Sequence, residues 1–239
     1  MTAVRIEDRV MANPRWVVAD EVASAARRRF PREVLAIGVH GSLAHGDDTE
    51  GSDVDLVVVT HAPDTGPRPN TRRIDGVLVD LGVIGADEYL GHARTLSTSW
   101  PLAADRYLTT RPIYDPHAWF ERLRDTHLGR LAEAADWEFT ALAREAWCQG
   151  ASAHAKATRL AGWYDTDAAL LLLAEGRLAA AMVAGLLART YFRNSADAVR
   201  RTGLAAANVT ELGAVFDAQA EELAGRGRPV DGTVSALFD

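Results

Sequence analysis

The sequence has few of the features that mark several classes of protein. Its 239 residues include a single cysteine, Cys148, which excludes an internal disulfide and a cysteine-based metal cluster. Because Cys148 lies in an apolar-periodic stretch, we expect a buried structural thiol. No window approaches the run of about 20 apolar residues that spans a bilayer, and the first 16 residues are too charged for a signal peptide. We therefore expect a cytoplasmic protein with no membrane partner.

Positive charge is also scarce, with 26 Lys and Arg against 33 Asp and Glu and a net charge of -7. A broad nucleic-acid face needs clustered basic residues, so this balance disfavours nucleic acid as a partner. It is compatible with a cationic small molecule, although a net negative charge also simply favours solubility. The composition, 48% hydrophobic and 25% charged, is that of an ordinary soluble globular protein.

The first half of the chain has the patterns of a mixed α/β domain. Helical periodicity, alternating or continuous apolar runs, and an Asp75-Gly76 pair typical of a tight hairpin predict its elements. These are a helix at 16–30, strands at 34–41 and 53–60, a hairpin at 72–84 and a helix at 86–94.

The second half is dominated by alanine, leucine and arginine and has no strand signal. Helices are predicted at 117–126, 130–161, 166–190, 195–203 and 209–224. The predicted fold is α+β: a small mixed β-sheet domain with flanking helices at 1–116, followed by an all-α helical bundle at 117–239.

The segment between the first two strands carries the chemistry. The first strand ends at Gly41-Ser42, an irregular polar loop follows, and Asp53-Val54-Asp55 opens the second strand. Alternate residues of a strand share a face, so Asp53 and Asp55 lie about 6–7 Å apart. Two carboxylates so close repel each other, and a hard divalent ion such as magnesium relieves that repulsion. Gly41 and Ser42 offer backbone N–H groups and a hydroxyl to phosphate oxygens.

A third carboxylate is expected from a neighbouring strand. Asp80 interrupts the apolar run VLVDLGV, and an acid buried in such a run is costly unless it is paired or bound to a metal. We predict a metal site of Asp53, Asp55 and Asp80. The alternative stays open that Asp53 caps a turn, Asp55 pairs with an arginine and Asp80 lies on a solvated edge.

The pattern GS-x10-D-x-D, followed by an acid on a later strand, resembles the nucleotidyltransferase superfamily that includes the DNA polymerase β-like enzymes. Within it, the kanamycin (aminoglycoside) nucleotidyltransferases are most similar. The motifs that carry the likeness are GVHGSLAHG, SDVD, VDLGVIGADEYL and SWPLAADRYLTTRPIYD. Of these, WPL and PIYD are not needed to bind metal, so their match in the same order is specific.

The resemblance implies an enzyme that carries two magnesium ions and uses ATP or another nucleoside triphosphate. A substrate hydroxyl would attack the α-phosphate and release pyrophosphate. It also implies a homodimer with active sites at the subunit interface. At the position of the family's triphosphate-binding arginine this chain has His45, and at that of its glutamate base it has Gln149. One turn earlier, Glu145 is the candidate base, and Lys156 on the same helical stripe is a candidate phosphate contact. A solvated helix face is the alternative.

Three functions therefore remain in view. The first is transfer of a nucleoside monophosphate, AMP from ATP, to a hydroxyl of an aminoglycoside-like antibiotic, which would confer antibiotic resistance. The second keeps the chemistry but modifies a protein or tRNA, as toxin-like members do. The third, which Gln149 motivates, is a nucleotide-binding module that has lost catalysis.

Overall fold

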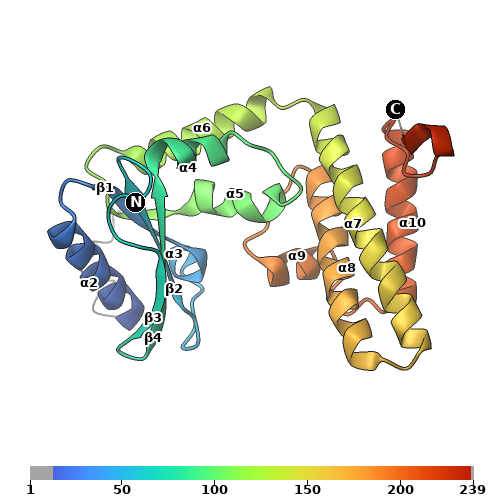
Figure 1. Ribbon diagram of the computed structural model, residues 1–239, viewed down its shortest axis with the longest axis horizontal. Helices are drawn as coiled ribbons and strands as arrows, with labels where there is room; N and C mark the ends of the chain where they lie inside the picture. Colours follow the sequence, from blue (N-terminus) through green and yellow to red (C-terminus); the bar gives the residue numbers. More distant parts are fainter. Residues whose placement is uncertain (1–12, 238–239) are drawn as a thin grey trace, which may run out of the picture. The chain divides into compact units, whose positions relative to one another are not determined.

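The computed structural model describes residues 13–237, which form two compact units (Figure 1). The first unit consists of the described residues up to Thr95 together with Asp105–Ala132. The second consists of Leu96–Ala104 and the described residues from Glu133 onward. Each unit is described by itself.

The first unit contains a five-stranded mixed sheet in the order β3-β4-β2-β1-β5. Its central strand β2 pairs antiparallel with β1 and parallel with β4. The outer strands β3 and β5 pair antiparallel with β4 and β1. The strands are β1 (Val34–His40), β2 (Val54–Thr60), β3 (Asn70–Ile74), β4 (Val77–Gly85) and β5 (Arg111–Tyr114). With its flanking helices, this sheet confirms the predicted fold class.

Helix α2 (Pro14–Arg29) covers the sheet and closes its core (Figure 1). The side chain of Asn13 caps it by accepting from the N–H of Arg15, which satisfies a donor that would otherwise have no partner. Its buried face packs against alternate residues of β1 and β2. The buried residues that form this contact are Val18, Ala19, Ala23, Ala26, Val34, Ile37, Val39, Val54, Leu56 and Val58.

The β3–β4 hairpin turns at Asp75 and Gly76, as predicted. Their φ angles are 48° and 84°, which are the two positive values of a type I′ turn. The predicted helix after the hairpin is also present, as α4 (Ala86–Ala93).

Helix α6 (Trp119–Glu133) belongs to the first unit as far as Ala132. Its Phe120 ring lies 2.8 Å from the place that a Cβ on Gly38 would take, and the Nδ1 of His127 lies 2.7 Å from the carbonyl oxygen of Ala93. These contacts hold α6 to the sheet and to α4. The first unit thus extends past the expected boundary at 116.

Two elements of this region were not predicted, α5 (Trp100–Thr109) and β5. Helix α5 contributes its first half to the second unit and its second half to the first. Strand β5 contains Pro112, which cannot donate a ladder hydrogen bond and is tolerated because the strand lies at the sheet edge.

The second unit is helical, as expected. It contains α7 (Asp136–Gly162), α8 (Thr166–Leu187), α9 (Ser195–Arg201), α10 (Val209–Gly225) and a 3-10 turn at Val234–Leu237. Small residues allow α7 and α8 to approach closely. A Cβ on Gly150 would lie only 2.7 Å from the Cβ of Ala179. Cys148 is exposed, so the prediction of a buried thiol was wrong because it lies on the outer face of α7.

Within the described residues, helix α8 is long and apolar enough to cross a membrane by length and composition. The expectation that no window approaches this limit was therefore wrong. Half of its most apolar window is buried inside the protein, where Leu173, Ala180 and Leu186 are core residues. The core helix of a soluble protein meets the same criterion, so α8 by itself is weak evidence for a membrane contact.

Candidate active site

The site is built around the turn that leaves β1. Strand pairing sets His40 opposite Asp55, so the chain after His40 must pass the Asp55 carboxylate. Gly41 takes a φ of +70°, and the Oδ2 of Asp55 lies 2.3 Å from the place that a Cβ on residue 41 would take. Only glycine allows both the backbone conformation and this approach. The carboxylate and the Gly41 backbone therefore share one small space.

Three carboxylates meet at this edge of the sheet. Asp55 and Asp80 are direct partners on the parallel strands β2 and β4, and Asp53 lies one residue before β2 begins. Burial, followed by the negative charges of Asp53 and Asp80, raises the pKa of Asp55 from 3.8 to about 6. The repulsion that the sequence predicts between these acids is present.

Asp80 differs from its prediction in one respect. Its side chain is exposed, and its Oδ1 accepts a 2.6 Å hydrogen bond from the hydroxyl of Thr71 on the outer strand β3. The argument that Asp80 is a costly buried acid was therefore wrong. Its place beside Asp55 comes from strand register instead.

The three carboxylates have the chemistry that a divalent cation requires of its ligands. Within residues 13–237, no three His, Cys, Asp or Glu side chains are grouped as a ready-made metal cluster. However, the carboxylates of Asp53, Asp55 and Asp80 are hard oxygen donors, and burial followed by like charges raises the pKa of Asp55. A divalent cation would stabilise such a donor set, and these three residues would hold it.

The segment after Gly41 is a short helix, α3 (Gly41–His45), and not the irregular loop that was expected. It ends at Gly46, which adopts a left-handed conformation. The Nε2 of His45 lies 3.0 and 3.1 Å from the two carboxylate oxygens of Asp105, and both side chains are largely buried. His45, predicted to contact the nucleotide, thus has a carboxylate partner from α5.

Arg106, the residue after Asp105, is the site residue that sequence reasoning missed. Its positive charge lowers the pKa values of both Asp55 and His40, so its guanidinium lies near the carboxylate edge. It is exposed, and in the described part of the chain no carboxylate lies within ion-pair distance of it. No sequence pattern singled out Arg106, because the segment WPLAADRYLTT was matched only as a whole.

The imidazole of His40 also lies near the carboxylate edge, since His40 pairs with Asp55 across the strands. Burial, followed by the charge of Arg106, lowers its pKa to about 4. His40 is therefore neutral at physiological pH and adds no positive charge to the site.

The segment between α3 and β2 is fastened to α2. Arg15, which is buried, donates from Nε to the carbonyl of Ser52 at 2.9 Å and from Nη2 to that of Glu50. Asn13 donates to Asp48 at 2.8 Å. These contacts hold the approach to Asp53 in place.

The remaining predicted residues lie on α7, in the second unit. Glu145 and Lys156 are both exposed there, as are Gln149 and Ser152 on the same stripe. Their roles as base and phosphate contact stay predictions.

A family model and solved structures are similar to parts of this chain. Residues 19–95 match the model of the nucleotidyltransferase domain, a segment that includes Gly41, Ser42 and all three site carboxylates. Among solved structures, a nucleotidyltransferase-like protein from Exiguobacterium sibiricum is similar, with 13% identity and a TM-score of 0.44. That likeness covers 87% of this chain and 74% of the other. No curated protein sequence matches the chain.

The Gly41 contact can be tested by comparing two glycines with positive φ. Gly41→Ala must strain the backbone and also displace the Asp55 carboxylate, whereas Gly46→Ala, with φ +75° and nothing within 4 Å of the added Cβ, only strains the backbone. We expect a loss of about 1 kcal/mol for Gly46→Ala and about 2–4 kcal/mol for Gly41→Ala in urea unfolding. Equal losses would contradict the close contact.

The raised pKa of Asp55 predicts a pH dependence of stability. Between pH 4 and pH 6 the folded protein keeps a proton that the unfolded chain releases, so this group lowers stability as the pH rises. Asp55→Asn cannot ionise. We therefore expect the variant to gain about 1–3 kcal/mol of unfolding free energy relative to wild type between pH 4 and pH 7. A difference that does not change with pH would contradict the shift.

Proposed function

We propose that this protein transfers a nucleoside monophosphate, AMP from ATP, to a hydroxyl of a cationic aminoglycoside-like molecule. The observation that carries the proposal is the meeting of Asp53, Asp55 and Asp80 beside the Gly41-Ser42 turn. It lies within the segment that matches the nucleotidyltransferase domain.

The reaction is an in-line displacement at phosphorus. The acceptor hydroxyl oxygen forms a bond to the α-phosphorus, the bond from that phosphorus to the bridging oxygen breaks, and pyrophosphate leaves with those electrons. The hydroxyl proton passes to a base, for which we propose Glu145. Magnesium held by the three carboxylates would supply charge stabilisation at the α-phosphate and the leaving group.

The other residues of the site position the triphosphate. Gly41 and Ser42 offer backbone N–H groups and a hydroxyl where the chain turns away from β1. His45 stands where the similar family has a triphosphate-binding arginine, but its imidazole already contacts Asp105. We therefore assign the positive charge at the triphosphate to Arg106. A guanidinium binds phosphate oxygens in a two-point fashion that an imidazole lacks. Lys156 is proposed as a further phosphate contact.

The acceptor class rests on charge and resemblance. A net charge of -7 favours a polycationic acceptor over tRNA. A homodimer and a cytoplasmic location belong to the same proposal.

The reaction is tested with purified protein, magnesium, ATP or GTP and a panel of aminoglycosides. We expect mass spectrometry to detect products heavier by one nucleoside monophosphate, together with pyrophosphate. Asp53→Asn should lower the rate by a factor of at least about 100, because a metal ligand is lost. Glu145→Gln tests the base in the same assay. The absence of product with every acceptor would contradict the proposal.

The role of Arg106 predicts a specific kinetic change. Loss of a charged hydrogen bond to phosphate costs about 1.5–3 kcal/mol, so Arg106→Ala should raise the KM or Kd for the nucleotide by a factor of about 10 to 100. The matched control is Arg122→Ala, at an exposed arginine on α6. Unchanged nucleotide binding in Arg106→Ala, measured by calorimetry, would exclude the role even if catalysis is impaired.

A further inference from the structure

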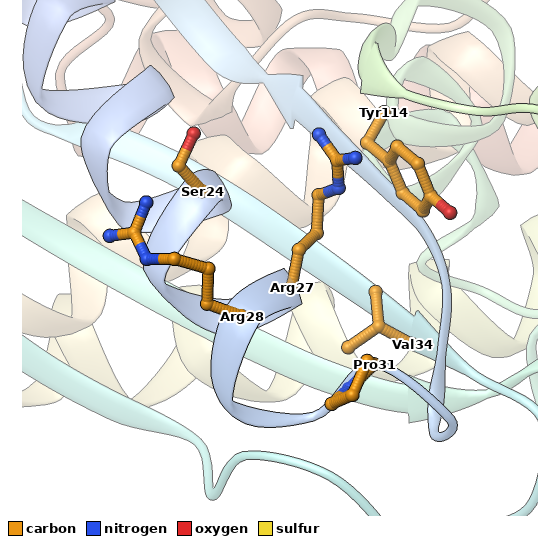
Figure 2. A pocket seen from close by; sticks show the side chains of 6 residues that line it. All are labelled: Ser24, Arg27, Arg28, Pro31, Val34 and Tyr114. Carbon is orange, nitrogen blue, oxygen red and sulfur yellow. The ribbon is translucent and has the colours of Figure 1, made fainter.

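A groove lined by two arginines lies at the end of β1 that is opposite the carboxylates. A groove of about 290 Å³ is lined by Ser24, Arg27 and Arg28 of α2, by Pro31 and Val34 after it, and by Tyr114 at the end of β5 (Figure 2). Val34 and His40 are six residues apart on β1, about 20 Å along a strand. The Arg27/Arg28 groove is therefore separate from the candidate active site, and all its residues belong to the first unit.

The side chain of Arg27 is held by an aromatic ring. Its guanidinium carbon lies 4.0 Å from the centre of the Tyr114 ring, and Figure 2 shows the two side chains next to each other. Stacking uses the flat face of the guanidinium and leaves its N–H donors free in the plane. The stack therefore holds the Arg27 cation in place at the groove, which Tyr114 also lines.

The positive charge of the groove is not neutralised by the protein. In the part of the chain that the structure describes, neither Arg27 nor Arg28 has a carboxylate within 4.0 Å. Arg28 and Ser24 extend from the helix one turn apart (Figure 2), so a second guanidinium and a second hydroxyl line the same groove.

Two guanidinium groups and two hydroxyls match the oxygens of a phosphate group. Arginine donates two parallel hydrogen bonds to phosphate, and hydroxyls complete its coordination. A volume of about 290 Å³ lies near the lower end of the range for small-molecule sites. It suits one small phosphorylated molecule, whereas a nucleic acid strand needs a longer basic surface.

We propose that the Arg27/Arg28 groove is a second ligand site, which binds the phosphate group of a small phosphomonoester. Arg27 and Arg28 contact the phosphate oxygens, and Ser24 and Tyr114 donate hydroxyl hydrogen bonds. The ligand is bound and not transformed, since the groove holds no acid, base or nucleophile aligned with a second reactive group.

The experiment uses calorimetry on the full chain with glucose 6-phosphate as the probe and glucose as its neutral counterpart. We expect the wild type to bind the phosphate ester and not glucose. The double variant Arg27→Ala, Arg28→Ala should weaken binding at least about tenfold, the value of one charged hydrogen bond. The control Arg122→Ala, Arg124→Ala removes two exposed arginines of α6 and should bind normally.

Three outcomes would overturn the proposal. These are no binding by wild type, equal binding by the groove variant, and equal weakening in the control variant, which would indicate a general charge effect. A twelve-nucleotide single-stranded RNA distinguishes the ligand class. If it binds through the two arginines and glucose 6-phosphate does not, the groove is a nucleic-acid contact instead. The double variant Arg27→Lys, Arg28→Lys keeps the charge and should bind with intermediate affinity. Circular dichroism checks that each variant is folded.

Discussion

The contact between the Asp55 carboxylate and the Gly41 backbone is the constraint on which the rest of the site depends. Asp55 lies on the central strand of the sheet, with β1 on one side and β4 on the other, and its neighbours Val54 and Leu56 are buried in the core. The backbone of Asp55 is therefore fixed beside the turn that leaves β1. Because residue 41 must pass the Asp55 carboxylate with a positive φ, that position needs glycine. The same pairing fixes Asp80 beside Asp55 by register alone. A rigid sheet, and not a flexible loop, sets the spacing of these two acids.

This arrangement lowers stability in order to keep reactive groups together. Three acids lie close at one edge, and the pKa of Asp55 rises because burial and its neighbours disfavour the charged form. Asp105, a fourth acid nearby, is already engaged by His45. Among the residues that the structure describes, the positive charge that acts on Asp55 is that of Arg106. A site left with unbalanced negative charge is costly for folding, and it is prepared for a cation. At the half-buried Asp55, a charged carboxylate would favour cation binding, but it is costly for folding.

Local patterns in the sequence predict much of the fold, and contacts between distant segments account for what they miss. A short apolar run identifies β1, and a run that alternates only at its start identifies β2. Asp75-Gly76 identifies the hairpin because its two positive φ angles suit few other residues. The five residues of α3 are too few to show helical periodicity, and Pro112 conceals β5 as a strand. Alternation marked Asp80 as a polar residue in an apolar run. It could not reveal that the Asp80 side chain is exposed and accepts a hydrogen bond from Thr71 on the outer strand β3. Arg106 is found only when α5 is placed against α3.

The net charge of the chain is a poor guide to where an anion could bind. The value of -7 led to the expectation that nucleic acid is disfavoured as a partner, yet a net charge carries no information about position. In the first unit, the guanidinium groups without a nearby carboxylate include those of Arg106, Arg27 and Arg28. The first lies at the carboxylate edge and the other two line a groove at the far end of the same strand. Net charge averages over the whole chain, whereas an anion responds to the cationic groups that lie close enough to contact it. A phosphate site is therefore sought in which side chains share a groove, as Arg27, Arg28 and Tyr114 do, and not in the charge of the whole chain.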